Sequence, residues 1–240
     1  MKNSFLMPAV AGLLCSIVLF GCGSTDSAGV SINGSTDSAG GSIKESTIYN
    51  KYCDIVSSSD PKRWDGFALI DLDGDGVKEL FATCIDGERE DEGIQPYMIA
   101  GCNKAGNPIV NDEFQDGVAG AGGYRGMLYY IEGKGLLHES MVFAPLGLPA
   151  DTIYELKDGM TEIKDQGEFS VDSYDDAEDD SWDPFEHGSW SWNGETVSEE
   201  KYYEMLKEST CDTEGSLMSE IDWKSKDAIF EELKKYTSKK

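Results

Sequence analysis

The sequence predicts an α+β fold in which an antiparallel β-meander sheet is packed by helices from the N- and C-terminal ends of one domain. Two dipeptides, Asp158-Gly159 and Asn193-Gly194, interrupt alternating apolar and polar runs, and both supply the positive φ that tight hairpin turns require. Apolar residues at helical spacing occur near the two ends of that domain. We therefore expect hairpin after hairpin in its middle, with helices packed against the sheet.

The predicted elements follow one another along residues 46–240, which we expect to form a single globular domain with one well-buried core. Strands are predicted in FALIDL, LFATCI, YMIAGCNKAGNPIV, GMLYYIEGKGLLHESMVF, TIYELKDGMTEIKD and SWSWNGETVS. The apolar faces of three predicted helices are Ile48, Tyr52 and Ile55; Tyr202, Tyr203 and Leu206, after Ser198 as an N-cap; and Ile229, Phe230, Leu233 and Tyr236.

Residues 1–21 have the pattern of a secretory signal peptide rather than that of a fold element. Lys2 supplies a basic start, an apolar stretch runs from Phe5 to Phe20, and the small residue Gly21 precedes Cys22. The apolar stretch is shorter than the roughly 20 residues that a membrane-spanning helix needs. The pattern therefore predicts export rather than a permanent transmembrane helix.

The residues from Leu19 to Cys22 resemble a bacterial lipobox. The resemblance implies that the Cys22 thiol is acylated by diacylglycerol, that the signal peptide is cut before this residue, and that the protein is held by lipid on the extracytoplasmic face of the cell membrane. Phe20 departs from the smaller residue that is usual at its position. The alternative is that Cys22 is an incidental cysteine beside an ordinary cleavage site.

Residues 22–45 are predicted to be a flexible tether between that anchor and the domain. The segment is rich in Gly, Ser, Thr and Asp, has no aromatic residue before Ser46, and contains the heptapeptide GSTDSAG twice. Such a segment buries too little apolar surface to become ordered. Its reach should grow as roughly 5 to 6 Å times the square root of its length, which holds the domain away from the bilayer.

The charge of the chain excludes one class of partner. The sequence has 46 acidic and 20 basic residues and a formal charge of −26, which becomes −27 once Lys2 is lost with the signal peptide. A surface this acidic repels nucleic acid and anionic lipid headgroups, and it favours cations, basic partners or neutral sugars. The alternative interpretation of most of these charges is solubility alone.

The stretch DLDGDGVKEL, which begins at Asp71, places four carboxylates between two apolar runs. Gly76 permits a sharp turn, and the expected ligands are the carboxylates of Asp71, Asp73, Asp75 and Glu79 and the carbonyl of Val77. Carboxylates crowded into a tight loop repel one another, and a divalent cation removes that cost. Ca²⁺ takes six to eight oxygen ligands and tolerates irregular geometry better than Mg²⁺ does. We therefore predict Ca²⁺ in a hairpin loop. The alternative is a solvated acidic turn that binds no ion.

The spacing of this loop resembles the DxDxDGxxD calcium loop of integrin-type FG-GAP repeats, in which a hairpin wraps the ion, with Glu79 where those repeats have Asp. An EF-hand would need a bidentate acid where Ala82 stands. More widely, the segments FALIDLDGDGVKEL, GAGGYRG before LYY, and WNGETVSEEKYYEML are similar to uncharacterised exported lipoproteins of clostridia-like Gram-positive bacteria. That resemblance covers most of the mature domain and implies no activity.

Four cysteines follow Cys22, an even number in an exported chain. Cys84 and Cys102 end two consecutive apolar runs, and a disulfide between them would require that they face each other across a strand pair. Free thiols are the alternative, and the cysteine spacing does not match that of a zinc site.

A dense acidic run from Asp172 to Asp183 mixes with aromatic residues and leads into a tryptophan-bearing strand. Trp182, Trp190 and Trp192 form a candidate ligand surface, because aromatic faces stack on sugar rings while carboxylates bind hydroxyl groups. The alternative is a solvated loop before an ordinary strand.

Catalytic motifs are incomplete in this sequence. HESMV lacks the second histidine of a zinc protease, and GSWSW is not a nucleophile elbow. His138 is interpreted as a strand residue with a hydrogen-bonded imidazole. Two classes of function stay open: a non-catalytic, calcium-stabilised surface lipoprotein that binds a carbohydrate or a basic partner, and a small exported hydrolase that uses two carboxyl groups, as glycosidases do.

Overall fold

The computed structural model describes residues 45–87, 93–119, 125–143, 147–171 and 183–238, all of which belong to one compact unit, Gly41–Lys240. The signal peptide, Cys22, nearly all of the tether and Trp182 lie outside the described residues. The elements run in the order α1 (Glu45–Ser58), β1 (Gly66–Ile70), β2 (Glu79–Thr83), β3 (Ile94–Cys102), β4 (Pro108–Val118), β5 (Arg125–Ile131), β6 (Leu136–Phe143), β7 (Leu148–Lys157), β8 (Met160–Val171), η1 (Pro184–Glu186), β9 (Gly188–Trp192), β10 (Glu195–Val197), α2 (Glu199–Ser209), β11 (Ser216–Leu217), η2 (Met218–Glu220) and α3 (Lys226–Thr237).

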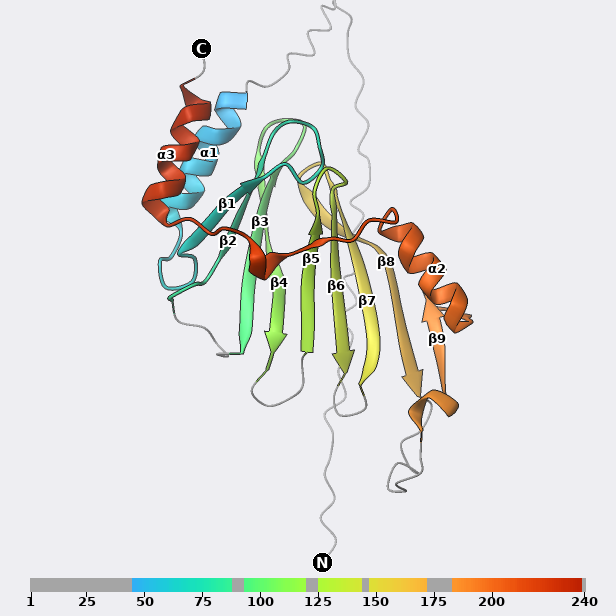
Figure 1. Cartoon of the computed structure of the whole chain (residues 1–240). Coiled ribbons are helices and arrows are strands. Elements are labelled where there is room, and N and C mark those ends of the chain that lie inside the picture. Colours follow the sequence, from blue (N-terminus) through green and yellow to red (C-terminus); the bar gives the residue numbers. More distant parts are fainter. Residues whose placement is uncertain (1–44, 88–92, 120–124, 144–146, 172–182, 239–240) are drawn as a thin grey trace, which may run out of the picture. The chain divides into compact units, whose positions relative to one another are not determined.

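The predicted antiparallel meander is confirmed. Strands β1 to β10 pair in sequence order within one sheet, and β11 adds to it beside β5 (Figure 1). Asp158 and Asn193 have φ values of 51° and 50°, and the glycine after each has a φ of 82°. Both predicted dipeptides therefore form the left-handed turns that join tightly paired strands.

The sheet curls so that the far end of the β3–β4 hairpin meets the turn between β7 and β8. The Asn111 side chain donates a hydrogen bond to the Gly159 carbonyl at 3.2 Å and accepts one from the Thr161 amide at 3.1 Å. A Cβ atom on Gly101 would lie 2.8 Å from the Gly159 carbonyl oxygen. Glycine at position 101 thus permits the close approach of two hairpins that are distant in the sequence.

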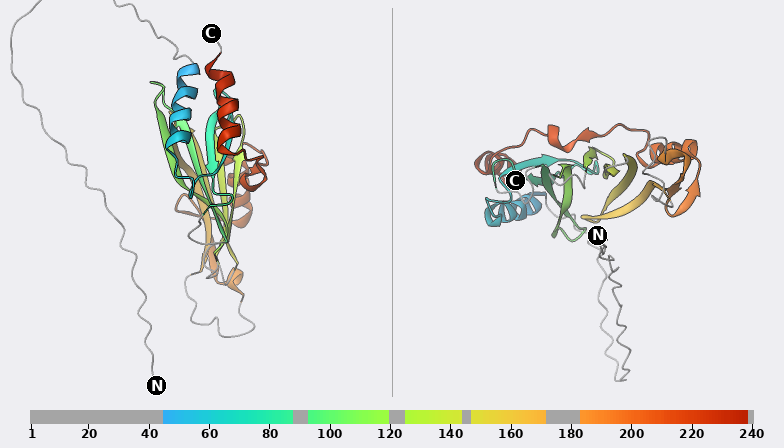
Figure 2. Two further views of the ribbon diagram at one scale, coloured as in Figure 1. Left: turned by 90° about the vertical axis from the view of Figure 1, so that its left-hand side faces the viewer. Right: turned by 90° about the horizontal axis from the view of Figure 1, so that it is seen from below.

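Strands β1 and β2 are buried on both faces, as their continuous apolar runs predict. On one face, helices α1 and α3 lie side by side, as Figures 1 and 2 show, and pack against β1 to β3. The ring of Tyr49 from α1 stacks on that of Tyr236 from α3 at a centroid distance of 4.4 Å. The predicted N- and C-terminal helices therefore form a common layer over one end of the sheet.

The other face of these strands is covered by the α2–α3 connector, residues 210–225, which crosses the sheet in Figure 1. Met218 in the connector is fully buried, and the ring of Trp223 stacks on that of Tyr97 at 5.9 Å. The backbone of Lys224 exchanges two hydrogen bonds of 2.8 Å with Phe67 at the edge of the sheet. The connector thus completes the core and protects the β1 edge from pairing with another chain.

Helix α2 packs at the opposite end of the sheet, against β8 and β9. The Ser198 hydroxyl accepts a hydrogen bond from the Lys201 amide at 3.2 Å, which confirms the predicted N-cap.

The Cys84–Cys102 disulfide prediction is wrong in this structure, because both residues are free cysteines. Thr83 pairs with Tyr97, and Leu80 pairs with Ala100. This register puts the two thiols at opposite ends of the β2–β3 pair, about 20 Å apart along the strands. A disulfide requires Cα atoms within about 7 Å, so antiparallel pairing itself prevents the bond.

We expect Leu233→Ala to lower the free energy of unfolding by about 2 to 5 kcal/mol, because Leu233 is fully buried where α3 meets the sheet. Lys235→Ala, at an exposed position two residues later on the same helix, should change it by less than about 0.5 kcal/mol. Urea unfolding of the Gly41–Lys240 unit measures both. Equal effects of the two substitutions would contradict the packing of α3.

Candidate metal centre

The acidic loop connects β1 to β2, two buried strands that pair in register from Gly66–Thr83 to Ile70–Glu79. Asp71 is the first residue after β1, and Glu79 is the first residue of β2. Ala82 lies fully buried in β2, so a strand stands where an EF-hand would have its second helix. The predicted placement of the loop in a β-hairpin is therefore confirmed.

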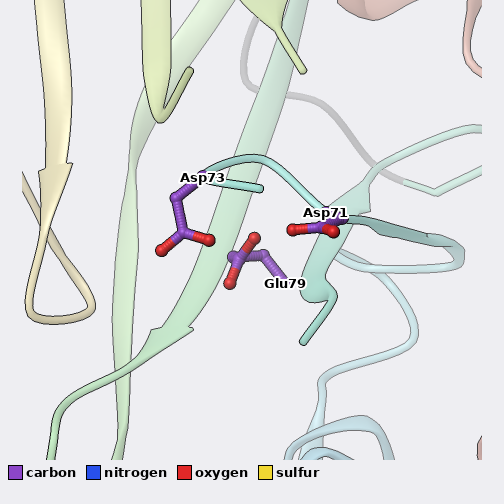
Figure 3. Close-up of side chains that lie close together, drawn as sticks. All are labelled: Asp71, Asp73 and Glu79. Carbon is purple, nitrogen blue, oxygen red and sulfur yellow. The ribbon is translucent and has the colours of Figure 1, made fainter. Parts of the chain in front are cut away.

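Three of the four predicted carboxylates converge. One oxygen from each of Asp71, Asp73 and Glu79 lies within 4.8 Å of the others (Figure 3). Asp73 is exposed, Asp71 is half-buried, and Glu79 is only 4% exposed. The cluster thus runs from solvent down to the base of the hairpin and offers oxygen ligands from both sides of the loop.

Backbone amides within the loop hold these carboxylates in place. The two oxygens of Asp71 accept hydrogen bonds from the amides of Gly74 and Gly76, at 2.9 and 3.2 Å, while Asp73 accepts one from the Asp75 amide at 3.1 Å. The Glu79 carboxylate accepts one from the Leu72 amide at 2.8 Å. Side chains that would otherwise sample many rotamers are thereby oriented before any cation arrives.

The loop is anchored in both hydrophobic layers of the fold. Leu72 is fully buried in the core beneath the α2–α3 connector, whereas Val77 packs against the core under α1 and α3. The Lys78 amide donates a hydrogen bond of 3.0 Å to the Tyr49 hydroxyl of α1. Burial raises the pKa of that Tyr49 hydroxyl to about 12, so it remains a neutral hydrogen-bonding group.

The turn between β5 and β6 supports the loop from its other side. The Gly133 amide donates to the Asp71 carbonyl at 3.1 Å, and the Gly135 amide donates to the Leu72 carbonyl at 2.6 Å. A Cβ atom on Gly74 would lie 3.1 Å from the Gly133 carbonyl oxygen, and φ at Gly74 is 77°. Sequence reasoning missed the contacts that Tyr49 and this turn make with the loop, because no local pattern links the loop to residues that lie 29 or about 60 positions away.

Burial and mutual repulsion raise the pKa values of two carboxyl groups in the cluster. Burial is the main cause for both, and it raises the pKa of Glu79 to about 8, with a further contribution from the charges of Asp73 and Asp75. The pKa of Asp73 is also raised, by burial and then by the charges of Asp75 and Asp71. Ionising Asp73 and Glu79 is therefore costly unless positive charge is supplied.

Asp75, the fourth predicted carboxylate ligand, lies apart from the cluster of three. The Asp75 carboxylate accepts a hydrogen bond from the Val77 amide at 2.7 Å, and it is not among the three groups that converge. Positive φ at Gly76, 89°, provides the predicted sharp turn. The carboxylates of Asp71, Asp73 and Glu79 are thus the residues best placed to hold a cation.

The prediction that Trp190 and Trp192 form a ligand surface is wrong, because both side chains are buried. Trp190 is 8% exposed and Trp192 is 2% exposed, and both rings pack against Tyr202 of α2. The two residues alternate with serine in β9, so both point to the same face, and that face is the one covered by α2. Their ring faces are therefore unavailable to a sugar, and Trp182 lies outside the described residues.

No family model, curated protein or solved structure matches this chain. Within the part of the chain that the structure describes, no helix is both long and apolar enough to cross a membrane. The function is therefore inferred from the chemistry of the residues themselves.

We expect the calcium-free protein to lose stability as pH rises from about 4.5 to about 8. Glu79 binds its proton more tightly in the folded state than in the unfolded chain. Its contribution is therefore complete below the unfolded pKa and is lost as pH rises through the folded pKa. Glu79→Gln keeps an acceptor for the Leu72 amide but cannot ionise, so it should remove this part of the slope.

Urea unfolding of the Gly41–Lys240 unit in chelator, at about pH 5 and about pH 9, measures the effect. Glu220→Gln, at an exposed position outside the loop, serves as the control and should retain the parental pH dependence. If the free energy of unfolding of the parent and of Glu79→Gln had the same pH dependence, Glu79 would not be the group that makes the protein less stable at high pH.

Proposed function

We propose that this protein is a membrane-anchored extracytoplasmic lipoprotein whose domain carries a structural Ca²⁺ ion in the β1–β2 loop, and that it acts as a non-catalytic binding or surface protein. The observation that carries this proposal is the convergence of Asp71, Asp73 and Glu79 within 4.8 Å on a loop already held by its own amides. Hard oxygen ligands of this kind suit a hard divalent cation.

Calcium fits the loop better than magnesium. Magnesium requires nearly ideal octahedral geometry at short distances, whereas calcium accepts irregular sets of carboxylate, carbonyl and water oxygens. Three carboxylates of unequal exposure, from both ends of a hairpin loop, supply an irregular set. Waters and further loop oxygens would complete the coordination.

The position of the loop supports a structural role for the ion. The loop contacts α1 through Tyr49, the β5–β6 turn through Gly133 and Gly135, and both hydrophobic layers through Leu72 and Val77. A cation that neutralises the loop therefore stabilises the junction of several elements rather than one exposed turn.

A carboxylate-dependent hydrolase is the second candidate, and the raised pKa values of Asp73 and Glu79 favour it, because such pairs serve acid–base catalysis. Accessibility counts against it. Glu79 is 4% exposed at the base of a closed loop, where a cation can lie but a sugar ring cannot. The same two carboxyl groups are thus better suited to metal binding than to glycoside hydrolysis.

The anchoring part of the proposal is supported by the signal-like residues 1–21, the lipobox-like residues Leu19 to Cys22, and the Gly/Ser-rich segment that follows. A bilayer is then the partner at Cys22. The strongly acidic surface, with a formal charge of −26 for the whole chain, makes nucleic acid an unsuitable partner and leaves a carbohydrate or a basic protein.

Calcium should raise the unfolding midpoint of the Gly41–Lys240 unit, because the native loop binds the ion and the unfolded chain does not. The expected gain is about 2.7 kcal/mol at a calcium concentration a hundredfold above the dissociation constant. Extracellular sites with such ligands have dissociation constants of about 10⁻⁴ to 10⁻³ M. Thermal unfolding in excess chelator and in about 10 to 100 mM calcium, a hundredfold above those constants, measures the difference.

Asp73→Ala should abolish this calcium dependence while relieving repulsion in the ion-free loop, so the variant becomes insensitive to chelator. Asp222→Ala, at an exposed position in the connector, is the matched control and should respond to calcium as the parent does. Equal midpoints of the parent with and without calcium, together with no heat of binding in a calcium titration, would mean that the loop is only an acidic turn.

Cys22→Ala in the full chain should prevent lipidation and move the protein out of the membrane fraction, since the acylated thiol is the expected anchor. Metabolic labelling with a fatty-acid probe, followed by fractionation, measures this. Cys211→Ala removes an exposed thiol in the domain and should leave labelling unchanged. Equal labelling of Cys22→Ala and the parent protein would end the lipobox interpretation.

A further inference from the structure

A cavity of about 480 Å³ lies between β5, β6, helix α2 and the start of the α2–α3 connector, away from the acidic loop. Its volume falls in the range of sites that hold small molecules. Tyr129, His138, Tyr203, Lys207 and Glu214 are among the residues that line it. The cavity is thus lined by aromatic rings, hydroxyl groups and charged groups.

The strand side of the cavity is a surface that carries two aromatic rings in a fixed orientation. The rings of Tyr129 and His138 stack with a centroid distance of 5.6 Å and an interplanar angle of 24°. His138 Nε2 lies 2.7 Å from an oxygen of Asp151. This agrees with the interpretation of His138 as a strand residue with a hydrogen-bonded imidazole.

Asp151 is 5% exposed and connects this surface to helix α2, since its second oxygen accepts a hydrogen bond of 2.7 Å from the Tyr202 hydroxyl. Burial by itself raises the pKa of Asp151, but the hydrogen bonds from His138 and Tyr202 outweigh it and lower the pKa. Asp151 therefore stays ionised at neutral pH, and its carboxylate accepts a hydrogen bond from the Nε2–H group of His138. The ring orientation is set before a ligand arrives.

The helix side of the cavity presents a third aromatic ring. Tyr203 is 50% exposed, although its neighbour Tyr202 is fully buried in the core with Trp190. The ring of Tyr203 contacts that of Trp190 at a centroid distance of 5.5 Å, so one part of it is supported and another part faces the cavity. Tyrosine has an apolar ring and a polar hydroxyl, which suits a ligand that is itself part apolar and part polar.

The rim of the cavity is a strained turn at the end of α2. Cys211 and Asp212 both have left-handed backbone angles, with φ values of 57° and 53°, although neither residue is glycine. Consecutive non-glycine residues in this region are sterically unfavourable and tend to occur where function requires them. The turn brings Asp212 within 3.2 Å of Lys207.

The charges at the rim select against an anionic ligand. The ion pair with Lys207 balances Asp212, which leaves Glu214 as an exposed acceptor in a chain of formal charge −26. An anion would meet this negative field without an uncommitted cation to bind it. Carboxylate and hydroxyl groups beside aromatic faces instead suit a ligand with hydroxyl donors and an apolar ring face.

We propose that this cavity binds a neutral carbohydrate of one or two sugar units, with the ring face of the sugar against Tyr203 and Tyr129 and its hydroxyl groups toward Glu214. The inference rests on the binding role proposed above and names its ligand class, but it does not depend on calcium. In this proposal the sugar contacts Tyr203 and Tyr129, which line the cavity, instead of the buried Trp190 and Trp192.

Saturation-transfer NMR of the Gly41–Lys240 unit tests the proposal with glucose, galactose, mannose and N-acetylglucosamine and their β-1,4-linked disaccharides. Each sugar is titrated to about 10 mM, which exceeds the dissociation constant of a weak small-ligand site. At least one sugar should give a saturable signal and change tryptophan emission, because Trp190 contacts Tyr203. Absence of binding by every sugar in this panel would overturn the proposal.

Tyr203→Ala should weaken binding of that sugar at least tenfold, and Glu214→Gln should weaken it without altering the unfolding midpoint, because Glu214 is exposed. Phe185→Ala is the matched control: Phe185 is 51% exposed and also packs on the core near α2, through Phe169, but it does not line the cavity. Unchanged binding in both cavity variants, or equal loss in the control, would place the sugar elsewhere.

Running the titrations in chelator and in calcium separates this inference from the metal proposal. If the protein binds a sugar and calcium does not change its unfolding midpoint, the cavity proposal is supported and the calcium site is overturned. If calcium raises the unfolding midpoint and none of the sugars binds, the calcium site is supported and the cavity proposal is overturned. Preferential binding of a lysine-rich peptide at the cavity would overturn the carbohydrate assignment in favour of a basic partner.

Discussion

The burial of Glu79 is the constraint on which the hairpin and its surroundings depend. Its carboxylate accepts a hydrogen bond of 2.8 Å from the Leu72 amide across the base of the β1–β2 loop. Burial raises the pKa of this carboxyl group to about 8. A carboxyl group in that position must either keep its proton or gain a positive partner. The charges of Asp73 and Asp75 add to the cost of ionising Glu79, and the proposed Ca²⁺ ion would offset that cost.

The β-meander connects the acidic loop to the cavity beside α2. The turn between β5 and β6 supports the acidic loop through Gly133 and Gly135, while the same two strands carry Tyr129 and His138 to the cavity beside α2. The α2–α3 connector lines that cavity and then closes the core beside the loop. Both candidate sites are therefore built on shared elements, although each uses different chemistry.

Much of the fold follows from local signals. Asp158-Gly159 and Asn193-Gly194 form the predicted hairpin turns because few other dipeptides adopt two consecutive left-handed residues at low cost. Ser198 caps α2 because its hydroxyl can reach an amide three residues later. By contrast, the tryptophans of β9 appeared available for stacking, and only the packing of α2 shows that they are core residues.

The sequence by itself determined the antiparallel meander, the terminal helices and the acidic loop at residues 71–79, because turn chemistry, periodicity and ligand spacing act over a few residues. Only the tertiary structure decided that Cys84 and Cys102 stay apart and that Asp71, Asp73 and Glu79 converge without Asp75. It also decided that His138, Asp151 and Tyr202 meet behind a cavity. Those outcomes depend on strand register and on helices folded back from distant positions, which no short segment of sequence encodes.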